Sequence, residues 1–382
     1  MRLTGAVLIV GGGPAGASAA LALRADGFDV ALLEQRSHWT GRVCGAFMSP
    51  EAVHNLTALG ILGAIRDAGA AAVDTAVVTA PSGCSVTLPV GQGGGALALP
   101  RHALEDTLLE LVRRSGATVE MGTRAVAVRW EDPDWAVDVR SEQAGHGVRR
   151  VPLVVLADGR FTMGAAVKLR PFGGWFGWNA SFRGVPRKPG ELSLHLFPGG
   201  YVGVLPFADG TANACGLAWF RHGPRHPWQA VWENALDRSK PLRDLMYAAE
   251  RIDEWRSIGP LPYLGSMRRG GGPILAGDAA GVGDPFMGEG IGRALGTGPL
   301  LAHCLATAGA GDVRAIRRAY EREWRARYAR RQFVGRQARR ILGNPWLVPL
   351  GLWGLTRSGP LLQRLLPLLH GFPGRPAPGP AA

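Results

Sequence analysis

The sequence predicts a mixed α/β fold, in which a parallel-sheet domain is interrupted by an antiparallel-sheet domain and followed by a C-terminal helical tail. Three observations lead to this prediction. Residues 6–34 contain an apolar run, a glycine-rich turn, a small-residue helix and a second apolar run, which is the order of a βαβ unit. Residues 171–262 hold short β-type runs between glycine-rich turns. After residue 313, apolar side chains recur at helical spacing among arginines.

Length and charge narrow the class of protein. The chain has 382 residues, 46% of them hydrophobic, which is enough for two intertwined domains or one large domain. The net charge of +13 is concentrated at one end: residues 313–340 hold eleven arginines and two glutamates, and three more arginines follow Arg340. The first 312 residues therefore carry only about +1, so the body of the protein does not have the basic surface of a nucleic-acid-binding protein.

Cysteine spacing and the N-terminus add two expectations. Cys44, Cys84, Cys215 and Cys304 form no C-x-x-C pair, so neither a metal site nor a disulfide framework is expected. The apolar N-terminal segment contains a glycine cluster that fits a nucleotide-binding turn better than a secretory signal. We therefore expect a cytoplasmic protein.

The βαβ unit carries a G-x-G-x-x-G motif with an acidic residue at the end of its second strand. The first glycine permits a tight turn, the second lets the backbone approach a pyrophosphate, and the third allows close helix–strand packing. The helix N-terminus presents N–H groups to the phosphates, and the carboxylate can accept the ribose hydroxyls. The residues predicted to hold a dinucleotide here are Gly11, Gly13, Pro14, Ala15, Gly16, Glu34, Gln35 and Arg36.

A second motif, after an apolar run at residues 273–276, selects FAD over NAD. Asp278 ends this strand, where its carboxylate can hydrogen-bond a ribityl chain among small residues. Glycines 288 and 290 then open a helix whose positive end can face the flavin ring. The predicted FAD-binding residues of this motif are Gly277, Asp278, Asp284, Pro285, Gly288, Gly290 and Ile291.

With both motifs, residues 6 to about 305 resemble the flavoproteins of the p-hydroxybenzoate hydroxylase fold, especially their geranylgeranyl-reductase-like branch. The resemblance implies that Asp158 and Gly159, which follow the strand at residues 151–157, contact the FAD pyrophosphate region. It implies an FAD contact for Arg101, just before a predicted helix at residues 102–113. Residues 41–45 resemble the branch's basic-x-Cys-Gly segment beside the flavin, which makes Cys44 a candidate catalytic or positioning thiol, or an inert buried residue.

The strand predicted at residues 192–197 offers candidates for the substrate site. Alternation places Ser193 and His195 on one face and the leucines on the other. His195 is a candidate proton donor, with a structural polar residue as the competing interpretation. Tyr201 and Pro206 match the branch's Tyr-x-Trp-x-Phe-Pro box, but glycine and leucine replace its tryptophan and phenylalanine.

These motifs divide the chain into domains. We expect the FAD-binding domain in three parts, residues 1–72, 97–170 and 263–312. A hairpin at residues 73–96 and residues 171–262 form the substrate domain, residues 313–372 a helical tail, and residues 373–382 a disordered end.

The tail has two interpretations. Ile316, Tyr320, Trp324 and Tyr328 form an apolar stripe on an arginine-rich helix, and apolar segments follow at residues 341–356 and 361–369. No segment is long enough to span a bilayer, but a basic amphipathic helix suits the surface of an anionic membrane. Alternatively, the helix packs as a cap on the FAD-binding domain.

The predicted function is that of an FAD-dependent oxidoreductase, reduced by NAD(P)H or another donor and acting on a lipophilic substrate such as an isoprenoid, polyketide or quinone. A geranylgeranyl-reductase-like reduction of a carbon–carbon double bond is favoured by the Cys44 segment. The alternative is a monooxygenase that hydroxylates an aromatic or polyketide substrate through C4a-hydroperoxyflavin. A remote alternative is an FAD-binding, membrane-associated protein without enzymatic activity.

Overall fold

A computed structural model describes residues 6–91, 95–160, 163, 174–186, 188–221, 227–261, 272–308 and 313–342. At its centre lies a five-stranded parallel sheet in the order β18-β11-β1-β2-β7, as predicted for the FAD-binding part. The strands are β1 (Ala6–Val10), β2 (Asp29–Leu33), β7 (Thr118–Glu120), β11 (Leu153–Leu156) and β18 (Ile274–Leu275). Their continuous apolar runs follow from burial on both faces of the sheet.

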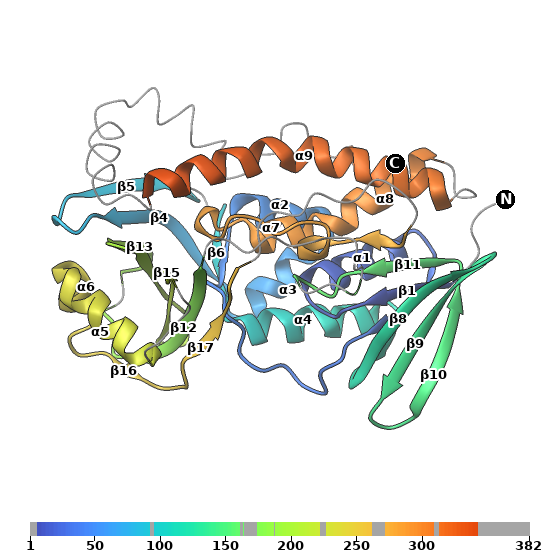
Figure 1. Ribbon diagram of the computed structural model, residues 1–382, viewed down its shortest axis with the longest axis horizontal. Helices are drawn as coiled ribbons and strands as arrows, with labels where there is room; N and C mark the ends of the chain where they lie inside the picture. Colours follow the sequence, from blue (N-terminus) through green and yellow to red (C-terminus); the bar gives the residue numbers. More distant parts are fainter. Residues whose placement is uncertain are drawn as a thin grey trace.

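Helices pack on this sheet and around it, with α1 against β1 and β2 and α4 against β7 (Figure 1). They are α1 (Pro14–Ala25), α2 (Pro50–Ala58), α3 (Leu62–Asp67), α4 (Arg101–Arg114), α7 (Gly290–Leu295) and α8 (Thr297–Ala308). Helix α1 packs tightly on the turn after β1, and only glycine fits at position 16. A Cβ atom there would lie 1.8 Å from the carbonyl oxygen of Gly11. Arg101 is the first residue of α4, rather than the residue before the helix as expected.

A separate three-stranded antiparallel sheet projects from one end of the molecule (Figure 1). It consists of β8 (Thr123–Glu131), β9 (Asp134–Ser141) and β10 (Gly145–Val151). The sequence predicts strands at residues 125–130 and 135–139, which correspond to β8 and β9, but it predicts no strand at β10. Six of the seven residues of β10 are exposed and polar residues and glycine dominate it, so it lacks the alternating apolar pattern that marks a strand.

The second large layer is a ten-stranded sheet, ordered β16-β12-β15-β14-β13-β4-β6-β3, with β17 beside β12 and β5 beside β4. Its long strands are β4 (Ala71–Thr79), β12 (Trp175–Arg183), β13 (Gly190–Phe197), β14 (Gly200–Pro206) and β15 (Thr211–Trp219). The short ones are β3 (Phe47–Met48), β5 (Ser85–Pro89), β6 (Leu97–Ala98), β16 (Glu250–Arg251) and β17 (Arg256–Ile258). The β4–β5 hairpin joins residues 174–261 through parallel pairing of β4 with β13. The exact domain boundaries stay a prediction.

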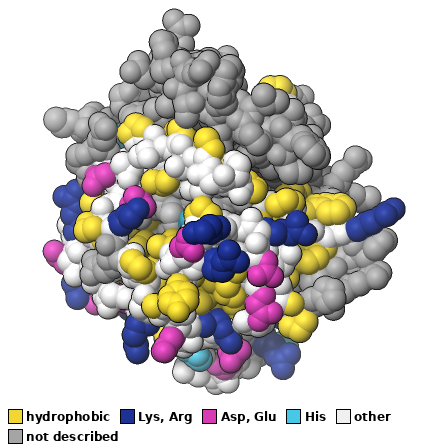
Figure 2. All heavy atoms as spheres, turned by 90° about the vertical axis from the view of Figure 1, so that its left-hand side faces the viewer, with side chains coloured by type: hydrophobic (Ala, Val, Ile, Leu, Met, Phe, Trp, Pro, Cys, Tyr) yellow, Lys and Arg dark blue, Asp and Glu magenta, His cyan; other side chains and the backbone are white. Residues whose placement is uncertain are grey.

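Two helices, α5 (Trp228–Arg238) and α6 (Lys240–Leu245), cover one face of this sheet over a cluster of aromatic side chains. Helix α6 begins at Lys240, where the Ser239 hydroxyl caps it by accepting a hydrogen bond from the Leu242 N–H. On the outside, hydrophobic side chains alternate with charged ones on the face at this end of the molecule (Figure 2).

The long helix α9 (Val313–Leu342) runs along the top of the molecule, from the side of α8 to above β4 and β5 of the ten-stranded sheet (Figure 1). Its predicted apolar stripe, Ile316, Tyr320, Trp324 and Tyr328, is fully buried in the same core as the parallel sheet. The stripe therefore packs as a cap on the protein. The apolar segments beyond Leu342 and the end at residues 373–382 lie outside the described residues. Within the described part of the chain, no helix is both long and apolar enough to cross a membrane.

Candidate functional site

A cavity of about 280 Å³ lies between the loops of the FAD-binding part and the ten-stranded sheet. One wall is formed by apolar side chains of neighbouring strands, including Val78, Leu194 and Leu205. The opposite side is formed by residues 43–47 and by residues 278–293. A mainly apolar chamber with a few charged groups suits a lipophilic molecule.

The structure brings together many of the predicted residues at this cavity, and it leaves others elsewhere. The predicted residues that line the cavity are Cys44, Tyr201, Asp278, Asp284, Pro285, Gly288, Gly290 and Ile291. Those that do not line it are the dinucleotide-turn residues Gly11, Gly13, Pro14, Ala15, Gly16, Glu34, Gln35 and Arg36, together with Arg101, Asp158, Gly159, Gly277 and His195.

The dinucleotide turn has the geometry that its sequence predicts. Gly11 adopts a φ of +107°, and a Cβ atom there would lie 2.4 Å from the Ala157 carbonyl oxygen. Helix α1 starts at Pro14 with no side chain capping its first turn. Glu34 is buried at the end of β2, where its carboxylate accepts hydrogen bonds from the N–H groups of Gly12 (2.9 Å) and Arg36 (3.0 Å).

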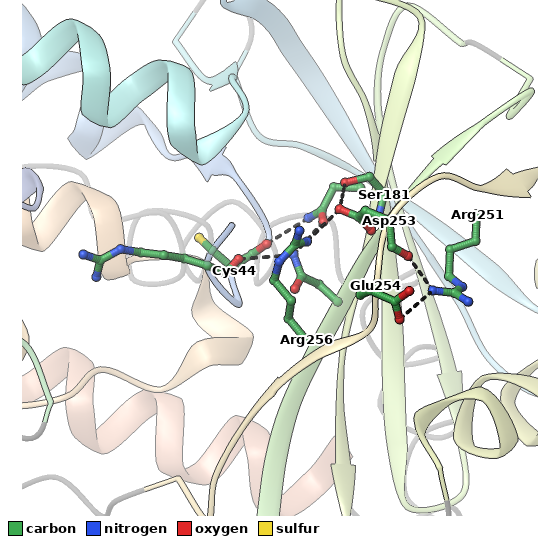
Figure 3. A network of polar contacts seen from close by, with 9 residues as sticks. Cys44, Ser181, Arg251, Asp253, Glu254 and Arg256 are labelled. Carbon is green, nitrogen blue, oxygen red and sulfur yellow. Dashed lines mark hydrogen bonds and ion pairs between the residues drawn. The ribbon is translucent and has the colours of Figure 1, made fainter. Parts of the chain in front are cut away.

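A polar network anchors the Cys44 loop to the sheet (Figure 3). The Asn213 side chain donates to the Cys44 carbonyl oxygen at 2.8 Å, and the Asn179 side chain donates to the Arg42 carbonyl oxygen at 3.2 Å and to the Asn213 side-chain oxygen at 3.0 Å. Both asparagines are buried in strands β12 and β15. The antiparallel sheet thus fixes the loop by its backbone and leaves the Cys44 side chain at the cavity.

Ser181, Asp253 and Arg256 extend this network. The Asp253 carboxylate accepts hydrogen bonds from the N–H and hydroxyl of Ser181 (2.7 and 2.8 Å) and from Arg256 (2.6 Å). The Arg256 guanidinium packs on Gly41, where a Cβ atom would lie 2.4 Å from it. A side chain at Gly41 would displace the Arg256 guanidinium from this position.

The Cys44 sulfur accepts a hydrogen bond from the Ala46 N–H at 3.3 Å. Ala46 has a φ of 58°, the only non-glycine residue with positive φ among the described residues, which marks backbone strain beside the cavity. Burial opposes the charge on Arg101, but the neighbouring Cys44 thiol and Glu105 carboxylate raise its pKa above the usual value. The buried Glu105 carboxylate also pairs with Arg42 at 3.2 Å, so two arginines converge behind the Cys44 loop.

Tyr201 projects from β14 into the cavity. Its ring meets Phe286 edge to face, with the centroids 5.3 Å apart. Burial, together with the nearby Cys215, Asp284 and Cys44, raises the pKa of the Tyr201 hydroxyl well above 10. Tyr201 therefore stays protonated at physiological pH.

His195 lies on the opposite face of β13 from the leucines that line the cavity. This agrees with the predicted alternation, but it separates His195 from Cys44 and Tyr201. The side chain is 4% exposed, and among the described residues neither ring nitrogen has a hydrogen-bond partner. Burial lowers its pKa to about 4. The geometry favours a structural role over the proton-donor interpretation.

Asp278 lies between two arginines that the sequence analysis did not single out. Its carboxylate oxygens are 3.3 Å from Arg293 Nη2 and 3.6 Å from Arg160 Nη2, and both arginines line the cavity. Arg160 directly follows the Asp158-Gly159 pair, a position that could have drawn attention. Arg293 and the cavity-lining Cys215 have no local signal, because only the packing of distant segments brings them to the site.

The residues present fit FAD. Ideal Cβ positions at Gly13, Gly159 and Gly290 meet open space, so all three predicted loops leave backbone accessible to a cofactor. The uncapped N-terminus of α1 and the buried Glu34 match a pyrophosphate and a ribose, respectively. On the second loop, the Asp278 carboxylate lies at the cavity wall.

Comparisons with known proteins agree with this geometry. A family model described as FAD binding domain matches residues 4–332. A menaquinone reductase of Mycolicibacterium smegmatis is 27% identical, over 95% of this chain and 89% of the relative. A digeranylgeranylglycerophospholipid reductase of Methanocella arvoryzae is 26% identical, over 81% of this chain and 79% of the relative. The solved structure of a flavin-dependent brominase shares the fold, with a TM-score of 0.81 at 19% identity over 96% of this chain and 93% of that chain.

The match extends from β1 to the last third of α9 and so includes both FAD motifs, the cavity and the buried stripe. The chain therefore belongs to the FAD-binding domain family and is an FAD-dependent oxidoreductase.

Proposed function

We propose that this oxidoreductase reduces a carbon–carbon double bond in the isoprenoid part of a lipophilic substrate, such as an isoprenoid quinone or an isoprenoid lipid. We propose NAD(P)H as the reductant. The observation that carries the proposal is the apolar cavity in which Cys44 and Tyr201 face the loop that carries Asp278. The names of the two reductases described above support an isoprenoid substrate.

The cavity residues match the needs of this reaction. FAD, when bound, supplies two electrons and one proton, so saturation of a double bond needs a second proton from the protein. Tyr201 is the candidate donor, because it lines the cavity and carries a proton at neutral pH. Its raised pKa makes it a weaker acid than a free tyrosine, so its proton moves only as negative charge develops on the substrate carbon. Cys44 is held in place by Asn213 and contributes either a proton or a contact to the substrate. The leucine and valine wall excludes water and binds an apolar chain.

The test is a single turnover without oxygen. The FAD-loaded protein is reduced with dithionite and mixed with menaquinone or with a geranylgeranyl lipid, and the products are examined by mass spectrometry. After air has reoxidised any quinol, we expect a product whose isoprenoid chain has gained two hydrogen atoms and no oxygen. Tyr201→Phe is expected to slow this step about 100-fold while FAD stays bound. Recovery of unchanged substrate with both compounds would contradict the proposed substrate class.

A second candidate is a monooxygenase, which the fold shared with the flavin-dependent brominase and the water-excluding cavity favour. The same reduced protein, mixed with oxygen and an aromatic substrate, tests it. A product that gains one oxygen atom, and is absent without oxygen, would establish this activity.

We also propose that the protein meets a lipophilic substrate at an anionic membrane surface. Arg314, Arg318 and Arg322 are exposed on α9, on faces other than its buried stripe. Each arginine near an anionic surface contributes up to about 1 kcal/mol to binding. This association does not depend on the stripe, which is occupied by packing.

A further inference from the structure

A buried cluster connects helix α9 to the loop that carries Asp278. It consists of Glu51 on α2, Arg293 on α7, and Tyr328 and Arg331 on α9. These elements lie far apart in the sequence and meet beneath the middle of α9. The cluster reaches the cavity, because Arg293 is one of its lining residues.

Arg293 is the member that touches the FAD-binding loop. Its side chain is only 2% exposed, and Nη2 donates to Asp278 Oδ1 at 3.3 Å. The guanidinium also lies close to the following loop, since a Cβ atom at Gly283 would be 2.5 Å from Nη2. Arg293 therefore fixes both the Asp278 carboxylate and the backbone near Gly283.

Tyr328 holds Arg293 from the other side. The Arg293 guanidinium carbon lies 5.9 Å from the centre of the Tyr328 ring, and that of Arg331 lies 5.8 Å from the same ring. Each distance is within the range of a cation–π interaction, which is stronger when it is shielded from water. A long arginine side chain has many rotamers, and fixing one of them costs conformational entropy. Contact with the flat Tyr328 ring offsets part of this cost and so favours the rotamer in which Arg293 reaches Asp278.

Arg331 is itself anchored. Nη1 donates to Glu51 Oε2 at 2.8 Å, and the two side chains are 10% and 1% exposed. Arg327 lies 3.9 Å from the other oxygen of Glu51. The ion pair between α2 and α9 thus sets the position of the Tyr328 ring relative to α7.

We propose that Tyr328 and Arg331 are positioning residues of the FAD site, which act through Arg293 on Asp278. Helix α9 is then part of the cofactor site, although none of its described side chains lines the cavity. Its contribution is to hold Arg293 so that the carboxylate of Asp278 and the Gly283 backbone keep the geometry that the cofactor requires. The inference concerns FAD binding and does not depend on the substrate.

The test compares the dissociation constant of FAD for the apoproteins of four variants, measured by flavin fluorescence. Tyr328→Leu removes the ring and is expected to weaken FAD binding about 5- to 10-fold. Tyr328→Phe keeps the ring, so it is expected to stay within about two-fold of the parent protein. Ile316→Ala is the matched control, because Ile316 is equally buried on α9 but about 18 Å away along the helix. Arg331→Met tests the anchor and is expected to weaken FAD binding by a similar factor.

A structural effect alone would produce a different pattern. The unfolding midpoint of each apoprotein and the circular dichroism of the bound flavin are measured in parallel. We expect Tyr328→Leu to change the flavin spectrum and Ile316→Ala to lower only the midpoint. If Ile316→Ala weakens FAD binding as much as Tyr328→Leu does, the proposal is wrong. Unchanged FAD binding in Tyr328→Leu, or in Arg331→Met should Tyr328→Leu not fold, would also overturn it.

Discussion

Replacement of His195 by leucine tests both the stability and the chemistry inferred for this residue. Burial lowers the pKa of His195 to about 4, against 6.5 for an ordinary histidine. The fold therefore favours the neutral ring, and the unfolded chain binds a proton more readily. The contribution of the neutral His195 ring to the free energy of unfolding is fully present above about pH 6.5. It decreases as the pH is lowered from 6.5 toward 4 and does not change further below that. Linkage between these two pKa values predicts a loss of about 2 kcal/mol on going from pH 7.5 to pH 5.

Because no described residue hydrogen-bonds the ring, His195→Leu costs no such bond and removes the titration. We expect the variant to lose about 2 kcal/mol less stability than the parent protein over this pH range. Urea denaturation of the apoproteins at the two pH values measures the difference. His102→Gln, at an exposed position on α4, is the matched control and is expected to behave as the parent does. Equal pH dependence in His195→Leu and the parent protein would refute the reasoning.

The same variant separates the two interpretations of His195 in catalysis. His195 lies outside the cavity, on the other face of β13. We therefore expect His195→Leu to retain the single-turnover rate, whereas Tyr201→Phe loses most of it. A loss in His195→Leu as large as that in Tyr201→Phe, with FAD still bound, would restore His195 as a proton donor.

Three further predictions concern the cofactor and the tail. Asp278→Ala is expected to weaken FAD binding about 10- to 150-fold, and Asp278→Asn is expected to weaken it less. If Asp278→Ala keeps its full FAD content after dialysis, the assignment of this loop to FAD binding is wrong. Heat denaturation is expected to release all flavin as FAD, since no His or Cys lies in a recognisable flavin-linking motif, and flavin that stays with the precipitate would show a covalent bond. In vesicle flotation, the intact chain is expected to float with anionic lipid at low salt and less at high salt. A truncated protein that ends at Leu342 keeps the buried stripe, so its flotation shows whether the last 40 residues contribute to lipid binding. Truncation after Gly311 is unsuitable, because it would also expose the core beneath α9.

Local patterns were enough to predict most of the fold. The G-x-G-x-x-G turn with Glu34 specified β1, α1 and β2, because each of its glycines meets a steric requirement within a few residues. Short β-type runs between glycine-rich turns likewise specified the strands β12 to β15. Strand β10 escaped prediction because a solvent-exposed strand is stabilised by its pairing with β9, which leaves no apolar pattern in its own sequence.

The site was predictable only where a motif lies within one loop. Cys44, Tyr201 and Asp278 were named from the sequence, and all three line the cavity. Arg293 and Cys215 were not predicted as site residues, since α7 and β15 carry no motif at those positions. Alternation predicted that His195 and the leucines of β13 point to opposite faces of the sheet. It did not predict which of these two faces lines the cavity.

The amino-acid sequence by itself determined that this protein binds FAD and has a split FAD-binding domain, because glycine, carboxylate and strand–helix spacing act over short stretches of chain. The tertiary structure decided which groups share the cavity, and it decided that the stripe on α9 packs inward. Both depend on contacts between residues far apart in the chain, such as Arg331 with Glu51 and Asn213 with the loop at Cys44. An aromatic stripe has the same periodicity whether it meets lipid or a protein core, so only the surrounding packing distinguishes the two.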